Sequence, residues 1–204
     1  QGIWEMRARP RDYLYSKLMC WTALDRGIAL AGLIHAEDRV PQWRRTRGQI
    51  RDAILTRGWS DRAGAFTQSF GRDALDASAL MIPIMGLLPA GDPRMLSTMD
   101  AIEDRLTDAR GFVYRYEGED GLEGKEGTFV LCTFWLAQAR AMAGQVGRAR
   151  DLFERAAGCA NDVGLLSEQM DPDSGEQLGN FPQAFSHIGL INAAWAIHVA
   201  EGNA

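Results

Sequence analysis

Seven segments of the chain show helical hydrophobic periodicity, and along the sequence two kinds of segment alternate. The first kind is apolar on most sides and comprises residues 15–36, 73–87, 127–143 and 183–201. The second kind has one apolar and one charged face and comprises residues 42–57, 93–107 and 147–161. A helix that is apolar all round is buried, whereas a helix with one charged face is half exposed. The alternation therefore predicts an all-α fold with an inner and an outer layer of helices. Because no fixed sequence period is visible, a plain helical bundle or solenoid is the alternative.

Local signals agree with this assignment. Asp92 followed by Pro93 predicts a helix start, with a capping aspartate and a proline in the first turn. Two segments, 64–71 and 111–121, alternate like edge strands or long loops, and nothing has the spacing of a parallel sheet.

Composition excludes several classes of protein. The 204 residues are 46% hydrophobic and 24% charged, which indicates one globular domain or part of one. The net charge of −5 and the scattered basic residues argue against a nucleic-acid partner. The apolar stretch 184–200 contains Ser186, His187, Asn192 and His198, so we expect a buried helix rather than a membrane span.

Three cysteines, Cys20, Cys132 and Cys159, form no CxxC pair and lie in apolar stretches. We expect them to be buried thiols in a reducing compartment, and a cytoplasmic location follows from that expectation and from the lack of a signal peptide. The chain has no initiator methionine, so we expect it to be a piece of a longer protein.

Long loops between the helices are rich in glycine, aromatic residues and acids, as in "YRYEGEDGLEGKEGTF" and "LLSEQMDPDSGEQLGNFPQ". Aromatic rings stack on the apolar faces of a sugar, and amides and carboxylates bond its hydroxyls. The loops therefore favour a sugar ligand, although aromatic loops also cap hydrophobic cores.

The same loops give no support for a metal or an organic cofactor. "DPDSG" at 171–175 begins like a calcium loop, but its sixth and twelfth positions are Glu176 and Pro182, so we interpret it as a turn. His35, His187 and His198 lack metal-ligand spacing.

Carboxylates remain as candidate catalytic groups. Hydrolysis of a glycosidic bond needs one protonated carboxylic acid and a second carboxylate that acts as base or nucleophile. Glu5 lies among Ile3, Trp4 and Met6, a setting that suits the acid, and Glu168 lies between polar neighbours, a setting that suits the base.

Four motifs in this order resemble glycoside hydrolase family 15, the family of glucoamylases and bacterial trehalases. They are "GIWEMR…YLYSKLMCWTALDRGIALA", "RGWSDRAGAFTQSFGRDALDASALMIPIMGLLP", "EGTFVLCTFWLAQA" and "GLLSEQMDPDSGEQLGNFPQAFSHIGLINAA". The resemblance covers nearly the whole chain. It implies an α/α barrel of six helical hairpins, here incomplete with about seven helices, and makes residues 1–204 the C-terminal portion of a catalytic domain.

The resemblance also implies roles for particular residues. Glu5 corresponds to the general acid and Glu168 to the general base of an inverting hydrolase of α-linked glucosides, either trehalose or α-1,4-glucan ends. The substrate-binding residues expected from the motifs are Trp4, Arg7, Tyr15, Lys17, Trp21, Glu126, Phe129, Gln183 and His187. The first motif is closer to the trehalase branch.

The resemblance leaves a gap, because the Trp-x-Arg-Asp motif that grips the terminal glucose in the family has no match here. A missing N-terminal part, or an oligomer, would have to complete the barrel, and the resemblance does not predict activity for this chain alone. The alternative is a non-catalytic helical domain of the same ancestry that acts in sugar binding or assembly.

Overall fold

The computed structural model describes residues 2–4, 10–118 and 126–202. This part of the chain contains seven α-helices, the number predicted from the sequence. They are α1 (Leu14–Leu30), α2 (Val40–Arg57), α3 (Met81–Met85), α4 (Pro93–Arg105), α5 (Val130–Met142), α6 (Val146–Ala157) and α7 (Ala184–Ala200). Two short 3-10 helices, η1 (Glu37–Arg39) and η2 (Ala77–Leu80), precede α2 and α3.

The strands are two residues long and antiparallel, and they form two small sheets. β1 (Trp59–Ser60) pairs with β2 (Ala65–Phe66), and β4 (Gln169–Met170) lies between β3 (Thr128–Phe129) and β5 (Gln177–Leu178). The absence of a parallel sheet from the described residues agrees with the sequence-based expectation. The segment "DPDSG" forms the turn between β4 and β5, as predicted.

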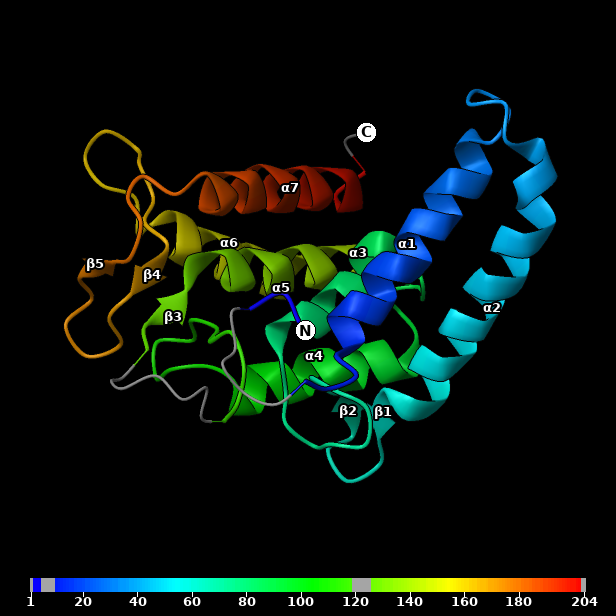
Figure 1. Ribbon diagram of the computed structural model, residues 1–204. Helices are drawn as coiled ribbons and strands as arrows, with labels where there is room; N and C mark the ends of the chain where they lie inside the picture. Colours follow the sequence, from blue (N-terminus) through cyan, green and yellow to red (C-terminus); the bar gives the residue numbers. More distant parts are fainter. Residues whose placement is uncertain (1, 5–9, 119–125, 203–204) are drawn as a thin grey trace.

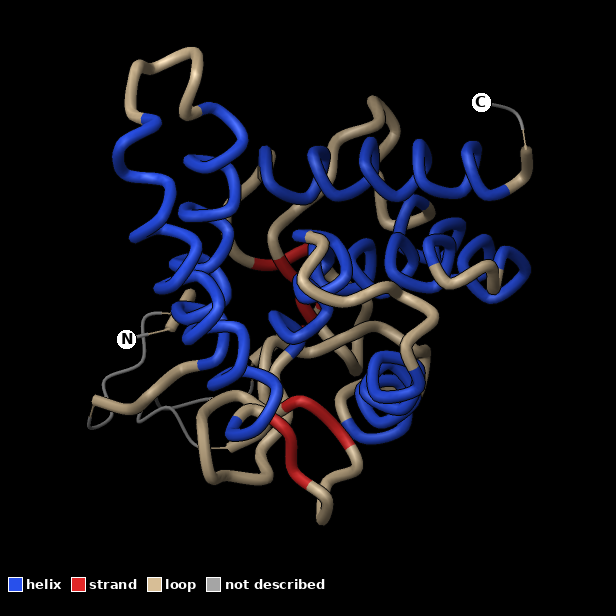
Figure 2. Tube along the Cα trace, turned by 90° about the vertical axis from the view of Figure 1, so that its right-hand side faces the viewer, coloured by secondary structure: helices blue, strands red, loops and turns tan. Residues whose placement is uncertain are grey.

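Helix α5 lies at the centre of the molecule, with α6 and α7 packed against it (Figure 1). Eleven of its thirteen residues are buried. Helices α1 and α2 form a separate hairpin at one side, and Figure 2 shows this hairpin standing beside the other helices.

The contacts between helices follow the predicted alternation. Among the apolar helices, α3 contacts both α1 and α5, and α5 contacts α7. Each amphipathic helix packs against members of that row: α2 on α1, α4 on η2 and α5, and α6 on α5 and α7. The buried side of α4 consists of Met95, Met99 and Ile102, and Leu106 follows directly. The apolar row is therefore the inner layer, and the charged helices cover it.

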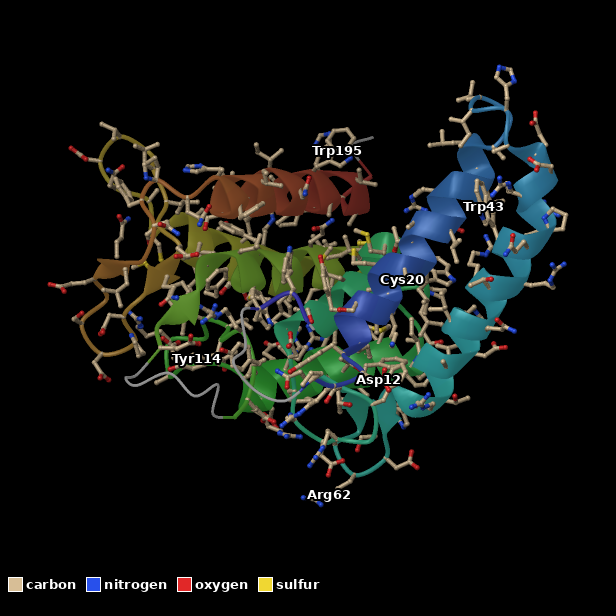
Figure 3. All side chains as sticks on the ribbon, viewed as in Figure 1. Asp12, Cys20, Trp43, Arg62, Tyr114 and Trp195 are labelled. Carbon is tan, nitrogen blue, oxygen red and sulfur yellow. The ribbon has the colours of Figure 1, made fainter. Side chains whose placement is uncertain are left out.

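Burial of the inner layer is incomplete at its two ends, where the prediction is wrong. Helix α7 exposes five large apolar side chains, Phe185, Ile188, Ile191, Trp195 and Val199. Trp195 stands on the outer side of α7, away from α5 (Figure 3). Cys20 on α1 is also exposed, whereas Cys132 on α5 is buried. The physical reason is that, within the described part of the chain, α1 and α7 stand at the two ends of the row, where α1 packs on α3 and α7 packs on α5.

The first and third helices depart most from their predicted bounds. Helix α1 ends at Leu30, and residues 31–35 form turns that finish with His35 at a φ of 52°. The predicted helix 73–87 begins only at η2, because the backbone before it pairs with a distant segment. Ala77 N donates to the Arg115 carbonyl at 2.8 Å, and Glu117 N donates to the Leu75 carbonyl at 2.9 Å.

None of the helices in the described ranges is long and apolar enough to cross a bilayer.

The predicted cap of α4 can be tested by mutation. The Asp92 side chain accepts a hydrogen bond from Arg94 N at 2.9 Å, and Pro93 follows in the first turn. Asp92→Ala should lower the free energy of unfolding by about 1 kcal/mol, because an unpaired backbone donor is left at the helix start. Urea denaturation measures this loss. The control is Asp104→Ala, which removes an exposed carboxylate near the negative end of the same helix and should cost nothing. Equal stability of the two variants would contradict the assignment.

Candidate active site

A cavity of about 810 Å³ lies where three inner helices begin. Tyr15, Leu131 and Phe185, which line it, lie in the first turns of α1, α5 and α7 respectively. Loop and helix residues complete the wall: Ile3, Trp4, Arg115, Tyr116, Phe129, Trp135, Glu168 and Asn180. The cavity therefore combines several aromatic rings with a carboxylate, an amide and a guanidinium, a set that can stack on a sugar ring and bond its hydroxyls.

Glu168 is half-buried at this cavity and is held by three N–H donors. Oε2 accepts from Asn180 N at 3.0 Å and from Asn180 Nδ2 at 3.2 Å, and Oε1 accepts from Gln183 Nε2 at 3.4 Å. Gly179, at a φ of 75°, lets the chain pass close by, since a Cβ there would lie 2.5 Å from Oε2. Donors of this kind suit an anionic acceptor and fix the direction of the carboxylate.

The beginning of α7 holds the loop that carries Glu168. Gln183 N donates to the Leu166 carbonyl at 2.8 Å, and Ser186 Oγ donates to the Ser167 carbonyl at 2.8 Å. His187 Nε2 accepts from Leu166 N at 3.2 Å. Gln183 and His187, both predicted from the sequence to bind substrate, thus hold the Glu168 loop and are not among the residues lining the cavity.

Trp4 is buried among the aromatic side chains of the cavity wall. Its ring centroid lies 5.6 Å from that of Phe129, 6.2 Å from that of Trp135 and 6.3 Å from that of Tyr116. Its indole Nε1 donates to the carboxylate of Asp76. Burial raises the pKa of the Asp76 carboxyl, and hydrogen bonds from Ser78, Trp4 and Gln68 oppose that shift.

Arg115 brings a positive charge to the same wall. Its guanidinium lies 5.5 Å from the Trp4 ring centroid and 5.3 Å from that of Phe129, and it pairs with Glu126. Stacking on aromatic faces and the carboxylate partner hold the guanidinium in one place. Glu126, predicted to bind substrate, is thus the ion-pair partner of a cavity residue.

The remaining predicted residues divide into three groups. Trp4, Tyr15, Phe129 and Glu168 meet at the cavity, and burial raises the pKa of the Tyr15 hydroxyl. Lys17 and Trp21 do not line it: Lys17 pairs with Asp12 at 2.9 Å, and Trp21 faces a different hollow between α1, α2 and α3. Lys17 and Trp21 follow Tyr15 on α1 by two and six residues, which rotates them by about 200° and about 240° around the helix axis and turns them away from the cavity. Glu5 and Arg7 lie outside the described residues.

Sequence reasoning did not single out Arg115, Tyr116, Trp135, Asn180 and Phe185. Arg115, Tyr116 and Asn180 lie in the aromatic and acidic loops, so loop composition was an available signal. Trp135 and Phe185 lie on apolar helices, where a ring that lines a cavity has the same sequence pattern as a ring in the core.

No group of three or more His, Cys, Asp or Glu side chains in residues 2–4, 10–118 and 126–202 could hold a metal ion.

Comparison with known proteins identifies the family to which the chain belongs. A family profile described as "Glycosyl hydrolases family 15" matches residues 1–195. The chain belongs to this family, as its motifs suggested.

Individual relatives narrow the comparison. The trehalase of Mycolicibacterium smegmatis is 46% identical over 207 residues, an alignment that covers 100% of this chain and 31% of the relative. The trehalase of Mycobacterium tuberculosis is also 46% identical, with 100% and 30% covered. The chain thus spans about a third of the length of these relatives.

Solved structures confirm the fold prediction. A bacterial glucoamylase complexed with acarbose superposes with a TM-score of 0.82 at 18% identity, covering 97% of this chain and 35% of that chain. The described helices therefore form part of a glucoamylase-like α/α barrel.

The cap at the start of α7 can be tested by mutation of Gln183. The Gln183 side chain caps α7 by accepting a hydrogen bond from Phe185 N at 3.2 Å, and it also donates to Glu168. Gln183→Ala should lower the free energy of unfolding by about 1 kcal/mol, because the cap is lost, whereas Gln183→Asn should keep most of the stability, because asparagine is itself a good cap. Urea denaturation of both variants checks this difference. Equal losses in the two variants would show that the cap contributes nothing.

Proposed function

We propose that this chain carries the catalytic carboxylates of an inverting hydrolase of α-linked glucosides. The single observation that supports this most strongly is the placement of Glu168 and Trp4 on one cavity, although 164 positions separate them (168 − 4). Glu5 is the next residue after Trp4 in the sequence. Glycoside hydrolysis requires two carboxylic groups that flank the scissile bond, and the proposal assigns these roles to Glu168 and Glu5.

In the proposed mechanism, Glu5 is the general acid and gives its proton to the glycosidic oxygen. Glu168, directed by Asn180 and Gln183, is the general base and removes a proton from a water molecule. That water attacks the anomeric carbon from the opposite face, so an α-glucoside yields β-glucose. Inversion leaves room for the water, with the carboxyl groups about 6.5–9.5 Å apart. The reaction as written uses no metal or organic cofactor.

Trehalose is the substrate we favour over α-1,4-glucan ends. The trehalases of two mycobacterial species align with the whole chain at 46% identity, whereas the glucoamylase shares 18%. The aromatic wall, with Arg115 and Tyr116, supplies stacking faces and donors for one glucose unit. The cytoplasmic location predicted from the sequence remains a prediction.

We also propose that residues 1–204 are the C-terminal portion of the catalytic domain, completed by an N-terminal part of a longer chain. Support comes from the coverage of about 31% of the trehalase from Mycolicibacterium smegmatis and from the uncovered apolar side of α7, including Ile188, Ile191 and Trp195. The same exposed side is the observation that favours the alternative, a non-catalytic domain acting in assembly. Catalysis by the protein at its natural length separates the two.

A sugar panel tests the substrate. The protein at its natural length, supplied with trehalose, maltose, maltotriose and isomaltose, should release glucose fastest from trehalose. Faster release from maltotriose would assign the protein to the glucoamylase branch, and release from none of the four would favour the non-catalytic alternative.

Glu168→Gln tests the assigned base. The amide keeps the size of the side chain but cannot accept the proton of water, so kcat should fall by about 10³-fold or more while substrate still binds. Proton NMR of the fresh products of trehalose, recorded on the wild-type enzyme, should show equal amounts of α- and β-glucose, because the attacked unit inverts and the leaving unit keeps its α configuration. Appearance of α-glucose alone would mean retention of configuration, and Glu168 would then not be the base. Glu176→Gln, at an exposed position on the same hairpin, is the matched control and should leave kcat unchanged.

A further inference from the structure

Asp76 is a buried carboxylate that the proposed chemistry does not use. Its residue is 3% exposed, and it lies just before η2, far in the sequence from the segment that contains Trp4. Both carboxylate oxygens lie 3.0 Å from Trp4 Nε1. Gln68 Nε2 donates to Oδ2 at 3.2 Å, and Ser78 N donates to Oδ1 at 2.8 Å. Burial of a carboxylate costs desolvation free energy, which hydrogen bonds from these donors offset, and the bonds in turn fix the position of each donor side chain.

The contact determines the orientation of one ring. Phe129, Trp135 and Tyr116 surround Trp4 and would allow the indole to turn over, because stacking contacts alone do not distinguish its two edges. The bond from Nε1 to Asp76 selects one orientation, since the opposite edge carries no donor. Trp4 in turn is the described residue that immediately precedes Glu5.

We propose that Asp76 is a positioning residue: by holding the indole of Trp4 it fixes the residue that immediately precedes the proposed acid, Glu5. This inference rests on the proposed function, in which Glu5 is the acid. Asp76 is not among the residues that line the cavity. Ser78 N and Gln68 keep the carboxylate itself in place, so the direction of control runs from Asp76 to Trp4.

The inference predicts a particular kinetic signature. A misplacement of about 1 Å at the reacting centre costs up to about 10²-fold in rate, whereas stacking of the sugar on Phe129 and Tyr116 is unaffected. Asp76→Asn in the protein at its natural length should therefore lower kcat by about 10²-fold and leave KM nearly unchanged. A merely structural defect would lower the amount of folded enzyme and the melting temperature without this division between kcat and KM.

A double-mutant cycle with Trp4→Phe tests whether Asp76 affects kcat through its hydrogen bond to Trp4. Phenylalanine keeps an aromatic ring but removes the N–H, so Trp4→Phe should also lower kcat. If Asp76 acts through this bond, adding Asp76→Asn to Trp4→Phe should cause little further loss. Additive losses in kcat would overturn the proposal, and so would an unchanged kcat in Trp4→Phe, whether or not the Asp76 variant folds.

Asp108→Asn is the matched control. Its carboxylate is 3% exposed and accepts from the backbone N–H groups of Arg110 and Phe112 at 2.9 Å, but it does not line the cavity. This variant should lose stability in the way that Asp76→Asn does and retain the kcat of the wild type. A loss of kcat in Asp108→Asn equal to that in Asp76→Asn would show that any buried carboxylate has this effect and would overturn the proposal.

Indole NMR gives a readout that does not depend on turnover. The six tryptophans give six indole N–H signals, and the signal missing from Trp4→Phe belongs to Trp4. In Asp76→Asn this signal should shift upfield and exchange faster with solvent, with the others unmoved. An unmoved Trp4 signal overturns the inference. This inference and the proposed function can fail separately. Full activity of Glu168→Gln would refute the proposed function. An inactive Glu168→Gln variant together with a fully active Asp76→Asn variant would refute this inference alone.

Discussion

Enclosure of α5 is the constraint on which the rest of the structure depends. A helix with eleven buried residues out of thirteen has no solvent-exposed side, so every neighbour must present an apolar surface to it. Helices α3, α6 and α7 and the short η2 meet this requirement from different directions. The first two turns of α5 place Leu131 and Trp135 at the cavity, so this largely buried helix also forms part of the wall of the candidate site.

The two sides of the cavity are held in different ways. The Glu168 side is fixed by short-range polar contacts, because the beginning of α7 bonds the loop through Gln183, Ser186 and His187. The Trp4 side is fixed by a contact between segments 72 positions apart, the buried bond to Asp76. Bringing together segments that lie further apart in the sequence costs more loop-closure entropy. The side chain of Glu168 is held by residues 12 and 15 positions away, and the Trp4 indole is held by a residue 72 positions away.

Features with local causes were predicted from the sequence, and features with tertiary causes were not. The number of helices, the cap at Asp92 and the buried side of α4 follow from spacing and from single residues, and the structure confirms them. The late start of η2 depends on backbone pairing between Leu75 and Glu117, which lie far apart in the sequence. The exposure of Ile191 and Trp195 depends on which neighbours α7 has, and an apolar pattern is the same whether or not a neighbour is present.

The candidate site shows the same division. Glu168, Phe129 and Trp4 were found through motif resemblance, which identifies residues but not their partners. Asp76 lies inside one of the matched motifs, yet nothing in "GRDALDAS" distinguishes a carboxylate that caps a short helix from one that also binds an indole across the core. A buried acid in such a stretch is therefore worth tracing to its donors, since its desolvation is tolerated only where several donors converge on it. In this chain the donors lead from Asp76 to Trp4, and so connect the interior of the barrel to the residue that precedes the proposed acid.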